Sequence, residues 1–145
     1  MTARDQSASD GVLRGAEHDR TMLSAMSTEM VALYKTQLGR GPTKVRTDWA
    51  GPDALLVTLE NSLTPAERRL VAMGEHARLR DARTFAQYAS IQEFIEVAER
   101  LTDRRVRAFV SGIDTAADVC SEVFYFEPEP PPSEDGQSPD GDRPR

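Results

Sequence analysis

The sequence predicts an α+β fold of two halves, each a helical part followed by a β-hairpin, forming a mostly antiparallel four-stranded sheet covered on one face by helices. Apolar residues recur every three or four positions in some segments and alternate in others, which is typical of helices and half-buried strands. In addition, the segment KVRTDWAGPD, which begins at Lys44, is nearly repeated as RVRAFVSGID from Arg105. A duplicated helix-hairpin unit accounts for these observations.

Composition places one folded domain between two tails. Residues 16–126 carry the periodic apolar patterns, whereas residues 1–15 are short of large apolar side chains. Residues 127–145 hold six acids, two arginines and six of the nine prolines. Because such segments cannot bury enough apolar surface to fold, we expect disordered tails over 1–15 and 127–145 and a single domain over 16–126.

Charge and hydropathy exclude several classes of protein. The net charge is −6 at pH 7, so the chain lacks the basic surface that general nucleic-acid binding needs. Its start lacks the pattern of a signal peptide, and no apolar run approaches the roughly 18 residues of a membrane-spanning helix. We therefore expect a cytoplasmic protein with no direct membrane insertion and no nucleic-acid partner.

Few residues have the chemistry of a catalytic or metal site. Cys120 is the only cysteine, which excludes an intrachain disulfide and a thiolate zinc site. The two histidines, His18 and His76, are not at the spacing of metal ligands, and no nucleophile and base can be paired by spacing. The sequence therefore predicts no enzyme, no metal and no cofactor.

The first helix is predicted over residues 16–38, ending at a C-cap Gly39. Its apolar stripe consists of Leu23, Met26, Met30, Leu33 and Tyr34. This stripe can cover the sheet of its own chain or form a seam between two chains, since Met packs adaptably at interfaces. A sheet covered on one face has another face to protect, so we expect a homodimer through this helix or through the sheet faces.

The first hairpin is predicted from strands over 44–50 and 55–60, with the turn at residues 51–53. Its buried side chains are expected to be Val45, Thr47, Trp49, Leu55, Val57 and Leu59. A helical region then runs from about residue 64 to 88, where Gly74 can kink it, and a further helix follows from Ser90. Thr64 with Glu67, and Ser90 with Glu93, both fit the capping-box pattern.

The second hairpin is predicted from strands over 105–111 and 119–126, with residues 112–118 as the turn. Alternation along the first of these strands places Val106, Ala108 and Val110 inward and Arg105, Arg107 and Phe109 outward. On the partner strands of the two hairpins, Glu60 and Glu122 are expected to point outward.

Five cations are candidates for an anion-binding site. They are Arg40, Lys44, Arg46, Arg105 and Arg107. If the two halves are related by a pseudo-twofold, the strand cations can meet in one patch that binds carboxylate, bicarbonate or phosphate. The alternative is a solvated sheet face on which these cations form ion pairs with Glu60 and Glu122.

A second candidate surface lies in the middle helical region. Arg69, His76, Arg80 and Arg83 recur at helical spacing and make one basic stripe. The stripe can bind an acidic partner, or it can be an ordinary solvated helix face.

Three stretches resemble one family: GRGPTKVR from Gly39, LTPAERRLV from Leu63, and RVRAFVSGID with DVCSEVFYF toward the end of the domain. In order, they are similar to the MpsC-like family of small bacterial proteins, over about residues 23–126. This family is named for a Na+-translocating, membrane-potential-generating system linked to bicarbonate uptake. The resemblance implies a non-enzymatic accessory or regulatory binding protein whose partner is a membrane transport protein. A small-anion or nucleotide sensor is the alternative.

Overall fold

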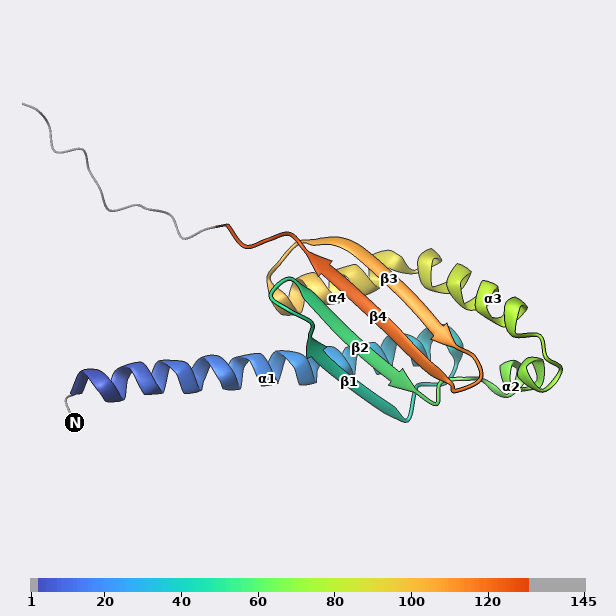
Figure 1. The fold of residues 1–145 in the computed structure, drawn as a ribbon, viewed down its shortest axis with the longest axis horizontal. Helices are drawn as coiled ribbons and strands as arrows, with labels where there is room; N and C mark the ends of the chain where they lie inside the picture. Colours follow the sequence, from blue (N-terminus) through green and yellow to red (C-terminus); the bar gives the residue numbers. More distant parts are fainter. Residues whose placement is uncertain (1–2, 131–145) are drawn as a thin grey trace, which may run out of the picture.

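Residues 3–130 are described by a computed structural model, shown in Figure 1. The elements in chain order are α1 (Ala3–Leu38), β1 (Lys44–Trp49), β2 (Ala54–Glu60), α2 (Pro65–Ala72), α3 (His76–Ala89), α4 (Ile91–Thr102), β3 (Val106–Asp114) and β4 (Val119–Phe126). This arrangement confirms the predicted α+β class and the two hairpins. Most of the tail predicted over 127–145 lies outside the described residues.

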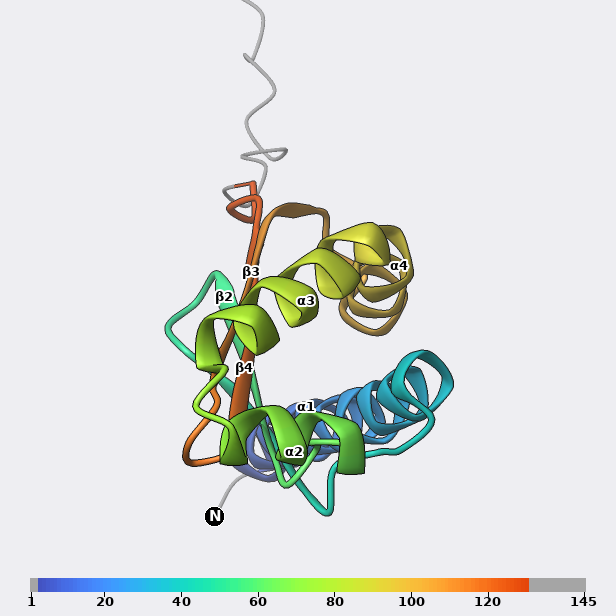
Figure 2. The same cartoon turned by 90° about the vertical axis from the view of Figure 1, so that its right-hand side faces the viewer.

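The four strands form one antiparallel sheet in the order β1-β2-β4-β3. The two hairpins therefore lie side by side, with β2 and β4 in the centre and the repeated segments on the two edges. Figure 2 shows helices α1 and α4 on one side of the sheet. Helix α3 packs against β3. Among the described residues, no helix covers the other face, which is turned toward the viewer in Figure 1.

The core lies between the sheet and the helices on its covered face. In the predicted α1 stripe, Met26, Met30 and Tyr34 are fully buried, and Leu23 and Leu33 are half-buried. Met22, which was not predicted, is also nearly fully buried. These side chains belong to one cluster with the inward residues of the strands and with Phe94 of α4. Because the stripe packs on the sheet of its own chain, it is not available as a seam between two chains.

Helix α1 begins at Ala3, well before the predicted start at residue 16, so residues 3–15 are helical where the sequence predicts a disordered tail. The side chains of residues 9–20 are exposed, including Val12 and Leu13. The N-terminal end of α1 extends beyond the sheet in Figure 1. Apolar periodicity cannot predict this early part of α1, because the helix continues there by propagation of its backbone hydrogen bonds.

The predicted kink at Gly74 is a complete break between α2 and α3. Gly74 has a φ of +75°, a left-handed conformation that ends the helix. The capping box of Thr64 and Glu67 is confirmed at the start of α2. The one predicted at Ser90 is wrong: the Ser90 side chain makes no cap hydrogen bond, because its backbone still completes the last turn of α3.

The inward and outward sides of β3 differ from the prediction because of a β-bulge. Val106 pairs with Phe126 and Ala108 pairs with Tyr125, which leaves Arg107 as an extra residue. Beyond the bulge the alternation is shifted by one, so that Phe109 is buried and Val110 is exposed. The strand also runs on to Asp114, so the predicted turn begins three residues too early.

The central strand β4 turns Glu122 toward the helices and not outward as expected. Its side chains alternate between the two faces, with Cys120, Glu122, Phe124 and Phe126 buried. The prediction that Glu122 forms an ion pair with the outward cations is therefore wrong. Burial of this carboxyl group creates a polar cluster inside the core, described below.

Candidate functional site

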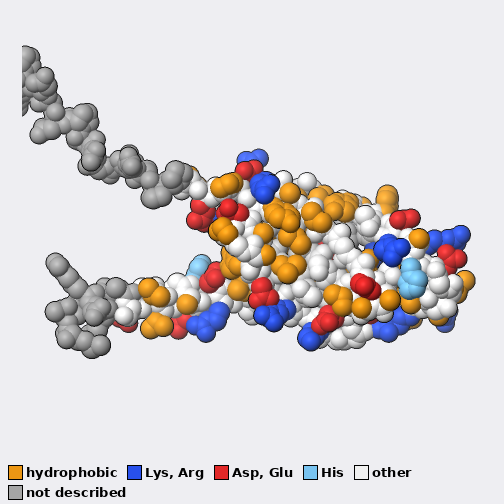
Figure 3. Space-filling model, in the orientation of Figure 1, with side chains coloured by type: hydrophobic (Ala, Val, Ile, Leu, Met, Phe, Trp, Pro, Cys, Tyr) orange, Lys and Arg blue, Asp and Glu red, His pale blue; other side chains and the backbone are white. Residues whose placement is uncertain are grey.

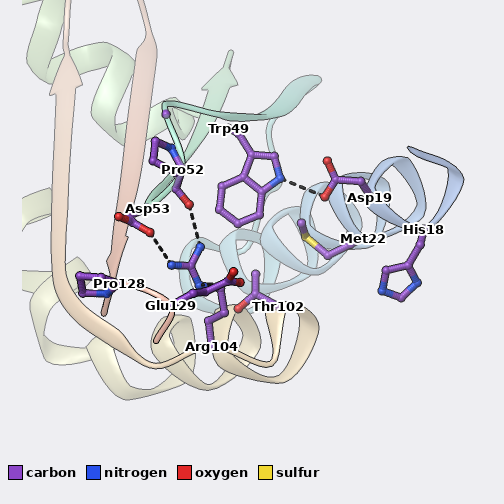
Figure 4. A pocket seen from close by; sticks show the side chains of 11 residues that line it. His18, Asp19, Met22, Trp49, Pro52, Asp53, Thr102, Arg104, Pro128 and Glu129 are labelled. Atoms are coloured by element: carbon purple, nitrogen blue, oxygen red, sulfur yellow. Dashed lines mark hydrogen bonds and ion pairs between the residues drawn. The ribbon is translucent and has the colours of Figure 1, made fainter. Parts of the chain in front are cut away.

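A cleft of about 580 Å³ opens at one end of the sheet, where α1, the β1–β2 turn and the end of α4 meet the segment after β4. Figure 4 shows its side chains. The residues that define its chemistry are Asp19, Met22, Trp49, Asp53, Arg104 and Glu129. They come from segments far apart in the sequence, so only the tertiary fold brings them together.

Arg104 is the fixed centre of this cleft. Its side chain is only 11% exposed, and its guanidinium lies 5.2 Å from the ring centre of Phe126 and 5.9 Å from that of Trp49. It donates hydrogen bonds to the Asp53 carboxylate at 2.6 Å and to the Pro52 carbonyl at 2.8 Å. Arg104 therefore ties the turn of the first hairpin to the end of α4, and its positive charge is already paired.

The remaining walls are acidic and aromatic. The Trp49 indole N–H donates to Asp19 of α1 at 3.1 Å, which orients the ring (Figure 4). Glu129 lies near Arg104, with 3.7 Å between Oε1 and Nε, beyond hydrogen-bond distance. Three carboxylates thus line the cleft together with one guanidinium and an aromatic ring; Asp19 is bonded to Trp49, and Asp53 to Arg104. This combination suits a cationic group, which carboxylates and indole rings both attract.

A second polar arrangement is closed off inside the core. Arg83 of α3 is 3% exposed and donates to both oxygens of Glu67, at 2.5 and 2.9 Å, and to the Ser62 carbonyl at 3.1 Å. Burial alone would raise the pKa of Glu67, but the bonds from Arg83 outweigh it and hold that pKa below its usual value. This buried ion pair fastens α2 to α3.

Glu122 lies in the same cluster without a cation of its own. The Tyr34 hydroxyl donates to its Oε1, while Oε2 has no hydrogen-bond partner among the described residues. Burial raises the pKa of Glu122 to about 7, although the bond from Tyr34 opposes this rise. Burial likewise raises the pKa of the neighbouring Cys120 thiol. A buried, protonated thiol is a poor nucleophile.

The structure does not bring the five candidate cations of the predicted anion site together. β1 and β3 lie on opposite edges of the sheet, so Lys44 and Arg46 are separated from Arg105 and Arg107 by two strands. The first pair is engaged locally: Lys44 contacts Glu60 at 3.3 Å and Arg46 contacts Asp48 at 2.7 Å. This part of the prediction failed because strand order cannot be read from the repeat.

The other predicted cations have separate roles. Arg40 donates to the Leu63 carbonyl at 2.6 Å, which joins the end of α1 to the start of α2. Arg107 lies over the Tyr125 ring at 5.5 Å. Arg105 is exposed, and its carbonyl accepts a hydrogen bond from the backbone of Glu127.

The predicted basic stripe is divided by the break at Gly74. Arg69 lies on α2 and Arg80 on α3, both exposed, whereas Arg83 is buried in its pair with Glu67. His76 shares a 2.6 Å hydrogen bond with the Thr115 hydroxyl in the second hairpin. These residues therefore do not form one continuous surface. The capping box marks Glu67 in the sequence, but no sequence signal pairs it with Arg83.

Two further observations concern membrane spans and metal ligands. None of the helices within residues 3–130 combines the length and the apolar character needed to span a bilayer. Over the same part of the chain, no three Asp, Glu, His or Cys side chains gather as a metal site would require.

Comparison with known proteins gives one match. A search of curated proteins and a search of solved structures both find no match. Residues 18–128, however, match the family described as Na+-translocating membrane potential-generating system (MpsC). The matched range contains the sheet, the buried cluster and the defining residues of the cleft except Glu129. The chain therefore belongs to the MpsC family.

Proposed function

We propose that the protein is a non-enzymatic accessory or regulatory subunit of a Na+-translocating, membrane-potential-generating system linked to bicarbonate transport. It acts at the cytoplasmic side of the membrane, as a homodimer, by binding a membrane transport protein. The family supplies the system. The acidic, aromatic cleft around Arg104 is the observation that carries the binding role.

The cleft has the features of a preformed recognition site. Arg104 and Asp19 hold the Trp49 ring in place before any ligand arrives, which lowers the entropic cost of binding. The excess of carboxylates selects a cationic group. Cytoplasmic loops of membrane proteins carry an excess of Lys and Arg, so a basic loop of the transport protein is the ligand we propose.

The buried cluster supports a role without catalysis. Cys120 is 2% exposed and Glu122 is fully buried, so a substrate cannot reach either group without opening the core. Their neighbours in the cluster, Arg83 and Tyr34, hold the helices against the sheet. We assign this cluster to stability.

The sole tryptophan makes the binding proposal directly testable, because Trp49 lines the cleft. Synthetic peptides rich in Lys and Arg, as models of the cytoplasmic loops of a membrane transport protein, are titrated into the full chain while Trp49 fluorescence is followed. A basic loop should give a saturable change that weakens with added salt, because exposed charges are screened. The double variant Asp19→Asn, Glu129→Gln should bind about tenfold more weakly, as expected for the loss of roughly 1.4 kcal/mol.

A matched control is Asp81→Asn, which removes an exposed carboxylate on α3, away from the cleft. It should bind like the original chain. Equal affinities for all three proteins, or no response to any basic loop, would reject the proposal. The anion-sensor alternative has less support, since its candidate cations lie apart; a rise in melting temperature with bicarbonate or phosphate would revive it.

A further inference from the structure

The uncovered face of the sheet, here called the open face, carries an apolar centre. Its apolar side chains are Leu56, Ala108, Val110, Val119, Val123 and Tyr125. Figure 3 shows hydrophobic side chains gathered over the middle of this face. Val110 alone is 50% exposed. The row of Thr58 and Ser121 separates Val119 from the others, which form one apolar patch. An apolar patch of this kind on a sheet is typical of an interaction surface.

Strand register arranges the open face in rows that cross all four strands. One row reads Lys44, Glu60, Val119, Asp114 from the β1 edge to the β3 edge. Another row, four residues along each strand, reads Asp48, Leu56, Val123, Val110. The apolar side chains thus occupy the centre and the β3 side, while the ends of the first row carry opposite charges.

We propose that a second copy of this chain covers the open face, related by a twofold axis that runs parallel to the strands between β2 and β4. This axis places each edge strand over the opposite edge strand of the partner and keeps every row aligned with itself. Lys44 then faces Asp114 of the partner subunit, and Leu56 faces Val123 of the partner subunit. The two sheets pack face to face, as in a β-sandwich. This proposal rests on the homodimer proposed above and assigns its interface.

Like-charge contacts count against the other face-to-face arrangement. A twofold axis running across the strands would place β1 over the partner's β1. Centred on the row of Thr58, it would bring Lys44 onto Asp48 of the partner subunit, but Arg46 onto the same residue of the partner subunit. Centred on the row of Leu56, it would bring Asp48 onto the same carboxylate of the partner. Like charges meet in both cases, which costs association energy.

The Asp114 carboxylate is held in a position that suits an ion pair with Lys44 of the partner subunit. Its Oδ1 accepts the backbone N–H groups of Ala116 and Ala117 at 3.0 and 2.8 Å, which holds the carboxylate at the end of β3. The Lys44 side chain is 77% exposed, and within the described chain its only ion pair is with Glu60. In the dimer it lies between Glu60 of its own chain and Asp114 of the partner subunit.

Cross-linking tests the proposal with two single variants of the full chain, Lys44→Cys and Asp114→Cys. A bismaleimide about 10 Å long matches the spacing of packed sheets. Mixed and cross-linked, the two variants should give a covalent dimer on a denaturing gel. Each variant alone should give none, because the axis places like positions on opposite edges. The original chain, whose Cys120 is buried, measures the background.

A solution mass measurement accompanies the cross-linking. The original chain should have twice the chain mass of 16.1 kDa, and Val123→Glu should have the monomer mass with an intact circular dichroism spectrum. If Val123→Glu fails to fold, the exposed Val110→Lys replaces it. Ala77→Glu, on the exposed side of α3, is the matched control and should remain dimeric.

Each other outcome overturns a defined statement. A monomeric original chain rejects the homodimer and this interface together. A dimer in which Lys44→Cys cross-links to itself rejects this axis, and one that gives no cross-link in the mixture rejects the sheet interface while keeping the homodimer. None of the six cleft residues belongs to the open face, so the fluorescence titration tests the cleft independently.

Discussion

The two hairpins begin with nearly the same ten residues and use them differently. In the first, Arg46 takes its place in a regular strand and pairs with Asp48. In the second, the equivalent Arg107 is the extra residue of a bulge and lies over Tyr125. Gly51 turns the first hairpin with a φ of +83°, whereas Gly112 lies inside β3 opposite Ser121. The partner strand, and not the repeated segment, therefore decides the register.

The covered faces of the hairpins differ as well. The first hairpin places Leu55, Val57 and Leu59 against the helices, whereas the second places Cys120 and Glu122 there beside aromatic rings. Val57 and Glu122 are direct neighbours on β2 and β4. One half of the duplicated scaffold thus supplies an apolar surface, and the other supplies the sites for a buried polar cluster.

Deletion of Arg46 or of the equivalent Arg107 should give the largest difference in stability between the two hairpins. Without Arg46, β1 must turn either Val45 or Thr47 and Trp49 to the open face, because a one-residue slip inverts a strand. We expect a loss of about 5 kcal/mol in the free energy of unfolding, comparable to the loss of a buried aromatic side chain. Deleting Arg107 should cost about 1 kcal/mol, because the bulge disappears and Val106 and Ala108 keep consecutive partners.

Urea unfolding followed by circular dichroism measures both deletions. The comparison depends on their difference and not on either value alone. Equal losses would mean that Arg107 is not an extra residue in solution and that the two hairpins share one register.

The buried ion pair beneath the second hairpin gives the next largest effect. Arg83→Met should lower the free energy of unfolding by about 4 kcal/mol, because it leaves Glu67 and the Ser62 carbonyl without their buried partner. Arg80→Met, on the exposed side of the same helix, should change it by less than about 0.5 kcal/mol. A similar small loss for both variants in thermal or urea unfolding would show that Arg83 is solvated.

Glu122 should make stability depend on pH, which its neighbour Val57 cannot do. Its folded pKa of about 7 lies above the ordinary value of 4.5, so the folded state favours the protonated carboxyl group. The contribution of Glu122 to the free energy of unfolding is therefore fully present below pH 4.5, and it is lost as the pH rises through about 7. By linkage the full loss is about 3 kcal/mol.

Urea unfolding between about pH 5 and pH 8 covers this window. The lowered pKa of Glu67 acts in the opposite direction, but its contribution is lost only as the pH falls below the ordinary carboxyl range, outside this interval. Glu122→Gln, which stays neutral and keeps an acceptor for the Tyr34 hydroxyl, should remove the fall in stability. A fall that persists in this variant would assign the titration to another group.

Local sequence signals predicted the parts of the fold that depend on local interactions. The capping box at Thr64, the C-cap Gly39 and the alternation of β1 all concern neighbours in the chain. The register of β3 and β4 could not be predicted in the same way, because both strands have apolar residues in both phases of the alternation. In VCSEVFYF, one phase contains Glu122 and three buried residues, and the other contains two valines and a tyrosine.

The cleft was beyond prediction for another reason. Asp53 and Arg104 are 51 positions apart, and Asp19 meets Trp49 across 30 positions. Each residue alone fits an ordinary turn, strand or helix surface. Only the packing of α1 and α4 on the same face of the sheet brings them to one site.

The smallest effects concern the repeated cations themselves. Arg46→Ala should cost no more than about 0.5 kcal/mol, since its pair with Asp48 is exposed. Arg107→Ala should cost about 0.5–1 kcal/mol through the lost contact with the Tyr125 ring. Because two strands separate these arginines, the losses in the double variant should add. A coupling larger than about 0.5 kcal/mol, or one that appears only with bicarbonate or phosphate, would mean that the two edges cooperate in binding an anion after all.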